Sequence, residues 1–237
     1  MDWYPSDKNT LDLLLNKLLK GPDKKIKKEV HGLIVPHAGY DFSGEIAGMA
    51  FALIKDKKPS KAIILGPSHY TGFFGARALD KKETPLGKIN LMKQTQDFDK
   101  IAYEHSIDNE IPFLQKINPD IFILPLAIGE LDDEEAEKLA EQISEIACDE
   151  TVFIFSTDLS HFLPYKEAVE RDKKTIEIIT SLKINKSQID ACGQFPLMVL
   201  MHLCKIKKWK PQLIGYKNSG DITGDKSSVV GYASFWF

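Results

Sequence analysis

Three of the six histidines come directly after segments that are typical of buried strands. They are His37, His69 and His161, the last of which follows Asp158 at the end of the same segment. In an open α/β sheet, ligand sites form just beyond the carboxyl ends of the strands. Imidazoles gathered at that edge suit metal binding or general acid–base catalysis. The sequence has no short ligand spacing such as HExxH or CxxC, so the pattern leaves both chemistries open.

Cys192 is the cysteine whose surroundings favour a functional thiolate. It directly precedes a predicted helix, and a helix N-terminus stabilises a thiolate, so we expect its pKa to lie below the usual value of about 8.5. Gly193 would let a ligand approach the backbone closely. Cys148, at a helix end, and Cys204, inside an apolar helical segment, are expected to be buried core residues. Three cysteines are too few for a disulfide framework, so we expect reduced thiols.

The remaining histidines are less informative. His31 and His202 are interpreted as structural residues. His105 stands beside Glu104 at the start of a predicted helix, where it could line the site or help to anchor that helix.

The hydrophobic pattern alternates between strands and helices. Strands are predicted at residues 29–35, 61–66, 121–126, 151–155 and 227–233, with shorter β-type segments near 78–79 and 89–91 and a strand-like tail from 211. Helices are predicted at residues 11–19, 44–54 (capped by Ser43), 104–115, 131–147, 165–182 and 196–206. This alternation implies an α/β fold with a largely parallel or mixed sheet and helices on both faces. Without a linker or repeat, residues 1–237 are expected to form a single domain.

The composition excludes several classes of protein. Hydrophobic residues make up 43% and charged residues 27% of the chain, which argues against disorder. The formal net charge of −3 shows no excess of positive charge that would indicate nucleic-acid binding. The lysine-rich runs at 24–28 and 205–210 are interpreted as solvated faces. The chain has neither an apolar segment long enough to span a membrane nor a signal-peptide pattern. We therefore expect a cytoplasmic protein with no nucleic-acid or membrane partner.

Short motifs in a fixed order carry a family resemblance. They lie at residues 35–40 with 43–44, 65–69, 84–87, 104–107 with 112–115, 156–161, 192–193 with 196, 216–221 and 229–233. Through them the sequence resembles the Memo family, also called AmmeMemoRadiSam system protein B, along nearly its whole length. Two positions depart from the pattern: Phe42 stands where some relatives have tyrosine, and Asp108 replaces a glutamate.

The resemblance implies a fold similar to the class III extradiol dioxygenases (LigB-like), a three-layer α/β/α sandwich. In those enzymes two histidines and a carboxylate hold non-haem iron, whereas in the Memo pattern a cysteine takes the place of the carboxylate. The implied metal ligands are His37, His69 and Cys192. The implied catalytic residues are Asp158 and His161, and the implied substrate-binding residues are Trp3, Tyr40, Ser68 and His105.

The expected function is metal binding by a His/His/Cys site in a dioxygenase-like cleft, with redox activity. Two imidazoles and a thiolate suit iron or copper best and also zinc, and no nucleotide cofactor is expected. One alternative is a non-catalytic binding module that holds a small anion or a peptide, because animal members of the family are associated with phosphotyrosine signalling. A second alternative is a zinc-dependent hydrolase. The family also implies a functional link to a radical-SAM protein.

Overall fold

The computed structural model describes residues 3–21, 28–183 and 188–237. Its centre is a mixed ten-stranded sheet of order β10-β12-β1-β9-β2-β8-β3-β7, with β11 beside β12 and β6 beside β8. The strands are β1 (Gly32–Val35), β2 (Lys61–Pro67), β3 (Ala76–Leu79), β6 (Asn90–Leu91), β7 (Lys100–Ile101), β8 (Phe122–Ile128), β9 (Thr151–Ser156), β10 (His161–Leu163), β11 (Gln212–Asn218) and β12 (Val229–Trp236). A separate ladder joins β4 (Glu83–Thr84) to β5 (Gly87–Lys88). Strands β1, β9, β2 and β8 are parallel, so their carboxyl ends share one edge.

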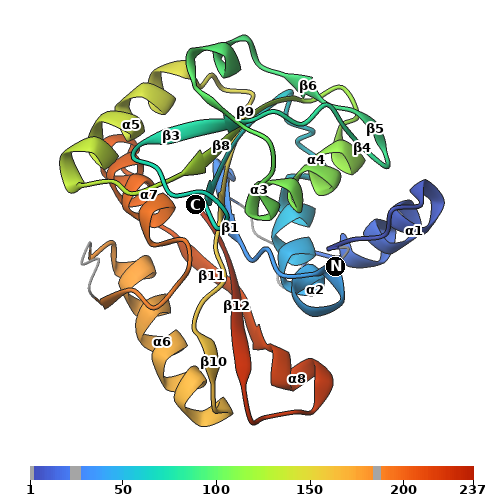
Figure 1. Cartoon of the computed structure of the whole chain (residues 1–237), viewed down its shortest axis with the longest axis vertical. Helices are drawn as coiled ribbons and strands as arrows, with labels where there is room; N and C mark the ends of the chain where they lie inside the picture. Colours follow the sequence, from blue (N-terminus) through green and yellow to red (C-terminus); the bar gives the residue numbers. More distant parts are fainter. Residues whose placement is uncertain (1–2, 22–27, 184–187) are drawn as a thin grey trace.

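Helices cover both faces of this sheet (Figure 1). One face carries α1 (Lys8–Leu18), α2 (Tyr40–Phe51), α3 (His105–Asp108) and α4 (Ile111–Ile117), and the other carries α5 (Asp133–Ile146), α6 (Tyr165–Ser181) and α7 (Gln194–Lys207). Successive strand residues point to opposite faces, so Leu33 and Val35 pack into the first core and Ile34 packs into the second. The three-layer α/β/α sandwich with a mixed, largely parallel sheet is therefore confirmed.

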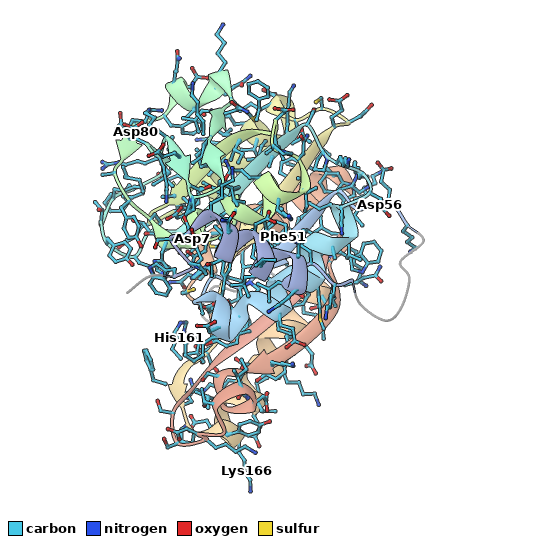
Figure 2. The ribbon with its side chains drawn as sticks, turned by 90° about the vertical axis from the view of Figure 1, so that its right-hand side faces the viewer. Asp7, Phe51, Asp56, Asp80, His161 and Lys166 are labelled. Atoms are coloured by element: carbon cyan, nitrogen blue, oxygen red, sulfur yellow. The ribbon has the colours of Figure 1, made fainter. Side chains whose placement is uncertain are left out.

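One end of the molecule projects beyond this sandwich (Figures 1 and 2). There β12 pairs antiparallel with β11 on one side and with the short β10 on the other. The five-residue helix α8 (Ser219–Thr223) follows β11. We call residues 161–163 and 219–230 the arm. The sequence predicted the strand character of β11 and β12 but neither β10 nor α8.

Some element boundaries differ from the predictions for local reasons. Helix α2 begins at Tyr40, so Ser43 lies inside the helix and donates a hydrogen bond to the Ala38 carbonyl instead of capping the helix. The helix predicted at 104–115 is two helices, because Pro112 lies in the first turn of α4 and cannot continue a preceding helix. Short 3₁₀ turns cover Ala52–Ile54 and Lys93–Asp97.

Two expectations drawn from the composition concern membrane spans and the lysine-rich runs. No helix within residues 3–21, 28–183 and 188–237 is long and apolar enough to cross a membrane. The lysines at 205, 207, 208 and 210 are exposed, as expected for a solvated face. The run at 24–28 lies outside the described residues except for Lys28, which is exposed.

Candidate metal centre

The sheet brings the strand-end residues together as the sequence predicted. His37 follows β1, Asp158 follows β9 and His69 follows β2, and these three parallel strands are neighbours. His105 reaches the same place from α3. This short helix is held at the end of β2, because Ser106 Oγ donates to the Pro67 carbonyl at 2.8 Å.

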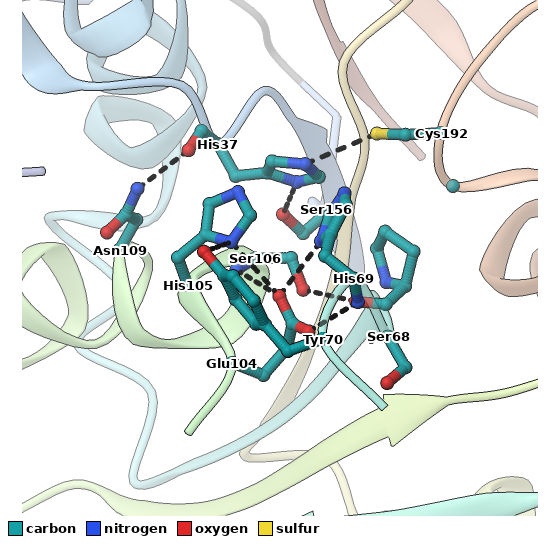
Figure 3. Close-up of polar contacts among 12 residues, drawn as sticks. His37, Ser68, His69, Tyr70, Glu104, His105, Ser106, Asn109, Ser156 and Cys192 are labelled. Atoms are coloured by element: carbon teal, nitrogen blue, oxygen red, sulfur yellow. Dashed lines mark hydrogen bonds and ion pairs between the residues drawn. The ribbon is translucent and has the colours of Figure 1, made fainter. Parts of the chain in front are cut away.

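The imidazoles of His37, His69 and His105 form a compact cluster (Figure 3). The ring centroids of His37 lie 5.1 Å from His69 and 5.3 Å from His105, and those of His69 and His105 lie 4.4 Å apart. One ring nitrogen from each residue lies within 4.8 Å of the other two. A single ion between the rings could therefore contact all three.

Glu104 fixes two of these rings from behind. Its carboxylate is fully buried and lies 2.9 Å from His69 Nδ1 and 3.2 Å from His105 Nδ1. It also accepts the main-chain N–H groups of His69 at 2.6 Å and Ser106 at 3.1 Å. Burial acts to raise the pKa of this carboxyl, but the hydrogen bonds from His105 and His69 outweigh it and hold the pKa well below its usual value. An ionised carboxylate accepts from Nδ1–H of His69, which leaves Nε2 of that ring free to bind a cation. The Nδ1 of His105 lies between Glu104 and the Tyr70 hydroxyl, which is 3.0 Å away.

His37 is oriented by a separate buried chain. Its Nδ1 lies 2.7 Å from Ser156 Oγ, and Ser156 donates its proton to Glu110 Oε1 at 3.2 Å. Ser156 therefore accepts from Nδ1–H, and Nε2 of His37 carries the lone pair. Burial lowers the pKa of His37 well below its usual value, which favours the neutral ring that a metal needs. Asn109 Nδ2 donates to the His37 carbonyl at 2.6 Å and holds the backbone.

Cys192 lies beside His37 but outside the histidine cluster. Its Sγ is 3.2 Å from His37 Nε2 and accepts the main-chain N–H of Asp158 at 3.2 Å. The thiol sits close because Gly193 packs against Thr157, where a Cβ would come within 2.5 Å of the Thr157 side chain. Burial, together with the charge of Asp158, raises the pKa of Cys192 well above its usual value. The expectation of a lowered pKa was wrong, since burial exceeds the effect of the helix start.

The other two cysteines differ in their exposure to solvent. Cys204 is buried in α7 as expected, and burial raises its pKa to about 12. Cys148 is exposed, so the prediction of a core residue was wrong. It follows α5 on a surface turn, and hydrogen bonding by Thr151 lowers the pKa of its thiol.

A cleft of about 590 Å³ opens from the histidine cluster toward the arm. Asp158 and His161 both line it. Asp158 Oδ1 accepts the main-chain N–H of His37 at 2.9 Å, and burial raises the pKa of its carboxyl to about 7. Burial lowers the pKa of His161, so its ring is neutral at pH 7.

Of the residues expected to bind substrate, three line this cleft and Ser68 does not. Trp3 lines it and stacks on His105, with ring centroids 4.1 Å apart. Tyr40 also lines it, while its buried hydroxyl donates to the Asn109 carbonyl at 2.6 Å. Ser68 is half-buried and donates to the Thr71 carbonyl, outside the lining of the cleft.

Sequence reasoning missed the residues that orient the imidazoles. Glu104 stands next to His105, and an acidic residue beside a histidine at a helix start could have indicated its role. Ser156 and Glu110 carried no such indication, because they meet His37 only through the packing of α4 on the sheet. His31 and His202 are structural as interpreted: one stacks on Trp209 and the other pairs with Asp133.

Comparisons with known proteins place the chain in a family and support the fold. Residues 2–236 match the family model of Memo-like proteins. A MEMO1 family protein of Sulfurisphaera tokodaii is 37% identical over 249 residues, covering 93% of this chain and 87% of the relative. One of Nitrosopumilus maritimus is 31% identical over 264 residues, covering 99% and 96%. An uncharacterized protein of Escherichia coli K12 shares the fold, with a TM-score of 0.55 and 9% identity over 87% of this chain and 99% of that chain. The chain therefore belongs to the Memo family.

Proposed function

We propose that this protein binds one iron or copper ion at the floor of the cleft and carries out redox chemistry there. The observation that carries the proposal is the meeting of His37 and His69 at one edge of the sheet, with His105 and Cys192 both next to His37. The Nδ1 atoms of the three histidines lie within 3.2 Å of a Ser156 or Glu104 oxygen, and one ring nitrogen of each lies within 4.8 Å of the others. Histidine ligands of metals are typically fixed by hydrogen bonds of this kind.

The donor set fits the proposed ions. Neutral imidazoles bind iron, copper and zinc, and a thiolate adds preference for softer ions. His37 and His69 belong to both possible ligand sets, with either His105 or Cys192 as the third ligand. We propose Cys192, since its Sγ lies 3.2 Å from His37 Nε2, and we assign His105 to the wall of the cleft, stacked on Trp3. A bound iron or copper ion would supply one-electron and Lewis-acid chemistry at this point.

Two further side chains are suited to proton transfer. His161 lines the cleft in its neutral form and can accept a proton from a cleft ligand. Asp158 has a pKa of about 7, so it can hold or release a proton near neutral pH beside the His37 backbone. We assign His161 the role of acid–base residue and Asp158 that of its proton-holding neighbour in the same cleft.

Metal analysis of protein prepared without oxygen tests the proposal. We expect about one iron or copper per chain, and changing His37 or His69 to Ala should lower metal affinity at least about tenfold. His31→Ala is the matched control, because His31 stacks on Trp209 and is absent from the cleft lining. Metal content that is the same in all three variants and the parent would contradict the proposal.

Cobalt substitution separates the two ligand sets. A thiolate bound to Co²⁺ gives a near-ultraviolet charge-transfer band, which Cys192→Ser should abolish and His105→Ala should leave in place. A band missing from the parent protein would assign the third position to His105. Stoichiometric zinc with no iron or copper would favour the zinc hydrolase, and no metal at all would favour the non-catalytic binding module.

A further inference from the structure

The cleft extends well beyond the histidine cluster. Its volume of about 590 Å³ is in the range that holds a small organic ligand. On the arm side the lining residues include Phe162, Ser219, Ser228 and Val230. Figure 2 shows His161 where the arm leaves the main body, so a ligand reaching past the metal would meet arm side chains.

Two phenylalanines present apolar surface to this cleft. Phe162 is 75% exposed and Phe42 is 42% exposed, although both line the cleft. Phe162 also has a φ of +59°, in the left-handed region that costs a non-glycine residue about 1 kcal/mol. The Phe162 ring has an edge contact with the His161 ring, with centroids 5.7 Å apart, but most of its surface faces solvent. A ligand that covers the ring would account for it.

The acidic and basic side chains that line the cleft favour a cationic ligand over an anionic one. Among the described residues that line it there is no lysine and no arginine, whereas Asp41 contributes an exposed carboxylate. His161 adds no positive charge, because burial lowers its pKa. An anionic ligand would therefore find no lysine or arginine among these lining residues, and a cationic ligand would find both a carboxylate and aromatic faces.

We infer that the cleft binds a small organic amine, with its apolar body on Phe42 and Phe162 and its ammonium group at Asp41. The inference rests on the proposed function in one respect, since the same cleft would hold the metal ion at its floor. The amine would then lie within reach of the metal and of His161. The ligand class is opposite in charge to the small anion of the binding-module alternative.

Three probes that share a phenyl ring test the charge preference: 2-phenylethylamine, 2-phenylethanol and phenyl phosphate. Their affinities are measured by NMR titration of the full chain, both metal-free and metal-loaded. In the metal-free protein the amine should bind about fivefold more tightly than the alcohol, the gain of one exposed ion pair. Phenyl phosphate should bind more weakly than the alcohol. Equal or tighter binding of phenyl phosphate by the metal-free protein would overturn the inference.

Variants assign the preference to residues. Asp41→Asn should remove the advantage of the amine over the alcohol, whereas Glu45→Gln should keep it. Glu45 is the matched control, because it lies on the same helix, pairs with Lys217 and does not line the cleft. Phe162→Gly should weaken the binding of the amine and of the alcohol to the same extent. The melting temperature should not fall, since glycine adopts the left-handed backbone conformation freely. An unchanged ratio in Asp41→Asn would overturn the assignment.

Iron or copper binding is measured separately on the same protein samples. Asp41→Asn and Phe162→Gly should bind iron or copper as the parent does. Intact metal binding without amine preference would overturn this inference alone. Amine preference without any metal binding would overturn the proposed function alone.

Discussion

Glu104→Gln should damage both the fold and the metal centre. The carboxylate is fully buried and is contacted by two histidine ring nitrogens and two main-chain N–H groups. Glutamine keeps one acceptor oxygen but turns an NH₂ group toward the remaining donors, leaving buried polar groups unpaired at about 1–3 kcal/mol each. With two donors left unpaired in this way, we expect a loss of about 2–6 kcal/mol in the free energy of unfolding. Metal affinity should fall about ten- to a hundredfold, because the imidazoles lose their orientation.

Urea unfolding and metal titration measure the two effects. Glu134→Gln is the control, because Glu134 pairs with Lys138 on the exposed face of α5 and should change neither quantity. The pKa of Glu104 is lower in the folded protein, so its contribution is present above its unfolded pKa of about 4.3 and is lost as the pH falls through the folded value. The difference in free energy of unfolding between the parent and Glu104→Gln should therefore become smaller in acid. A gap below about 1 kcal/mol at pH 7, the net worth of a single ordinary hydrogen bond, would refute the reasoning.

Two more predictions concern groups away from the ligands. Iodoacetamide should label Cys148 before Cys192 and Cys204, because Cys148 is exposed and its pKa is lowered; peptide mass mapping that finds Cys192 labelled first would contradict this. Asp172 is buried with a raised pKa, so the parent should lose stability as the pH rises from about 4 through the folded pKa, whereas Asp172→Asn should not. Urea unfolding at several pH values checks this, and parallel stability curves for parent and variant would count against it.

The sequence predicted the edge of the sheet where the candidate site lies. That prediction needs only the order of the strands and the direction in which each one runs. His37, His69 and Asp158 each follow a strand, and parallel neighbours place the ends of such strands together. His105 could not be placed in the same way, since its position depends on how α3 docks against β2. That contact is made by Ser106 and the Pro67 carbonyl, a pairing with no local sequence pattern.

The properties of the thiols could not be predicted because they depend on burial. Cys192 precedes a helix, and the local rule lowers the pKa of such a thiol. The loop carrying Cys192 instead packs against the end of β9, where desolvation raises the pKa. Cys148 shows the opposite case: a residue next to apolar helix positions is turned outward after α5 ends. Burial is set by tertiary packing, which a cysteine's immediate neighbours do not specify.

The raised pKa of Cys192 is compatible with the ligand role that we propose for it. His37 donates through Nδ1 to Ser156, so its Nε2 accepts, and the Cys192 thiol proton lies between Sγ and Nε2 over 3.2 Å. A metal ion would take the place of that proton and meet the same two lone pairs. The cation would also offset the burial that disfavours the thiolate, since coordinated thiols are deprotonated outright. Metal binding would thus release the Cys192 proton, and affinity would weaken as the pH falls.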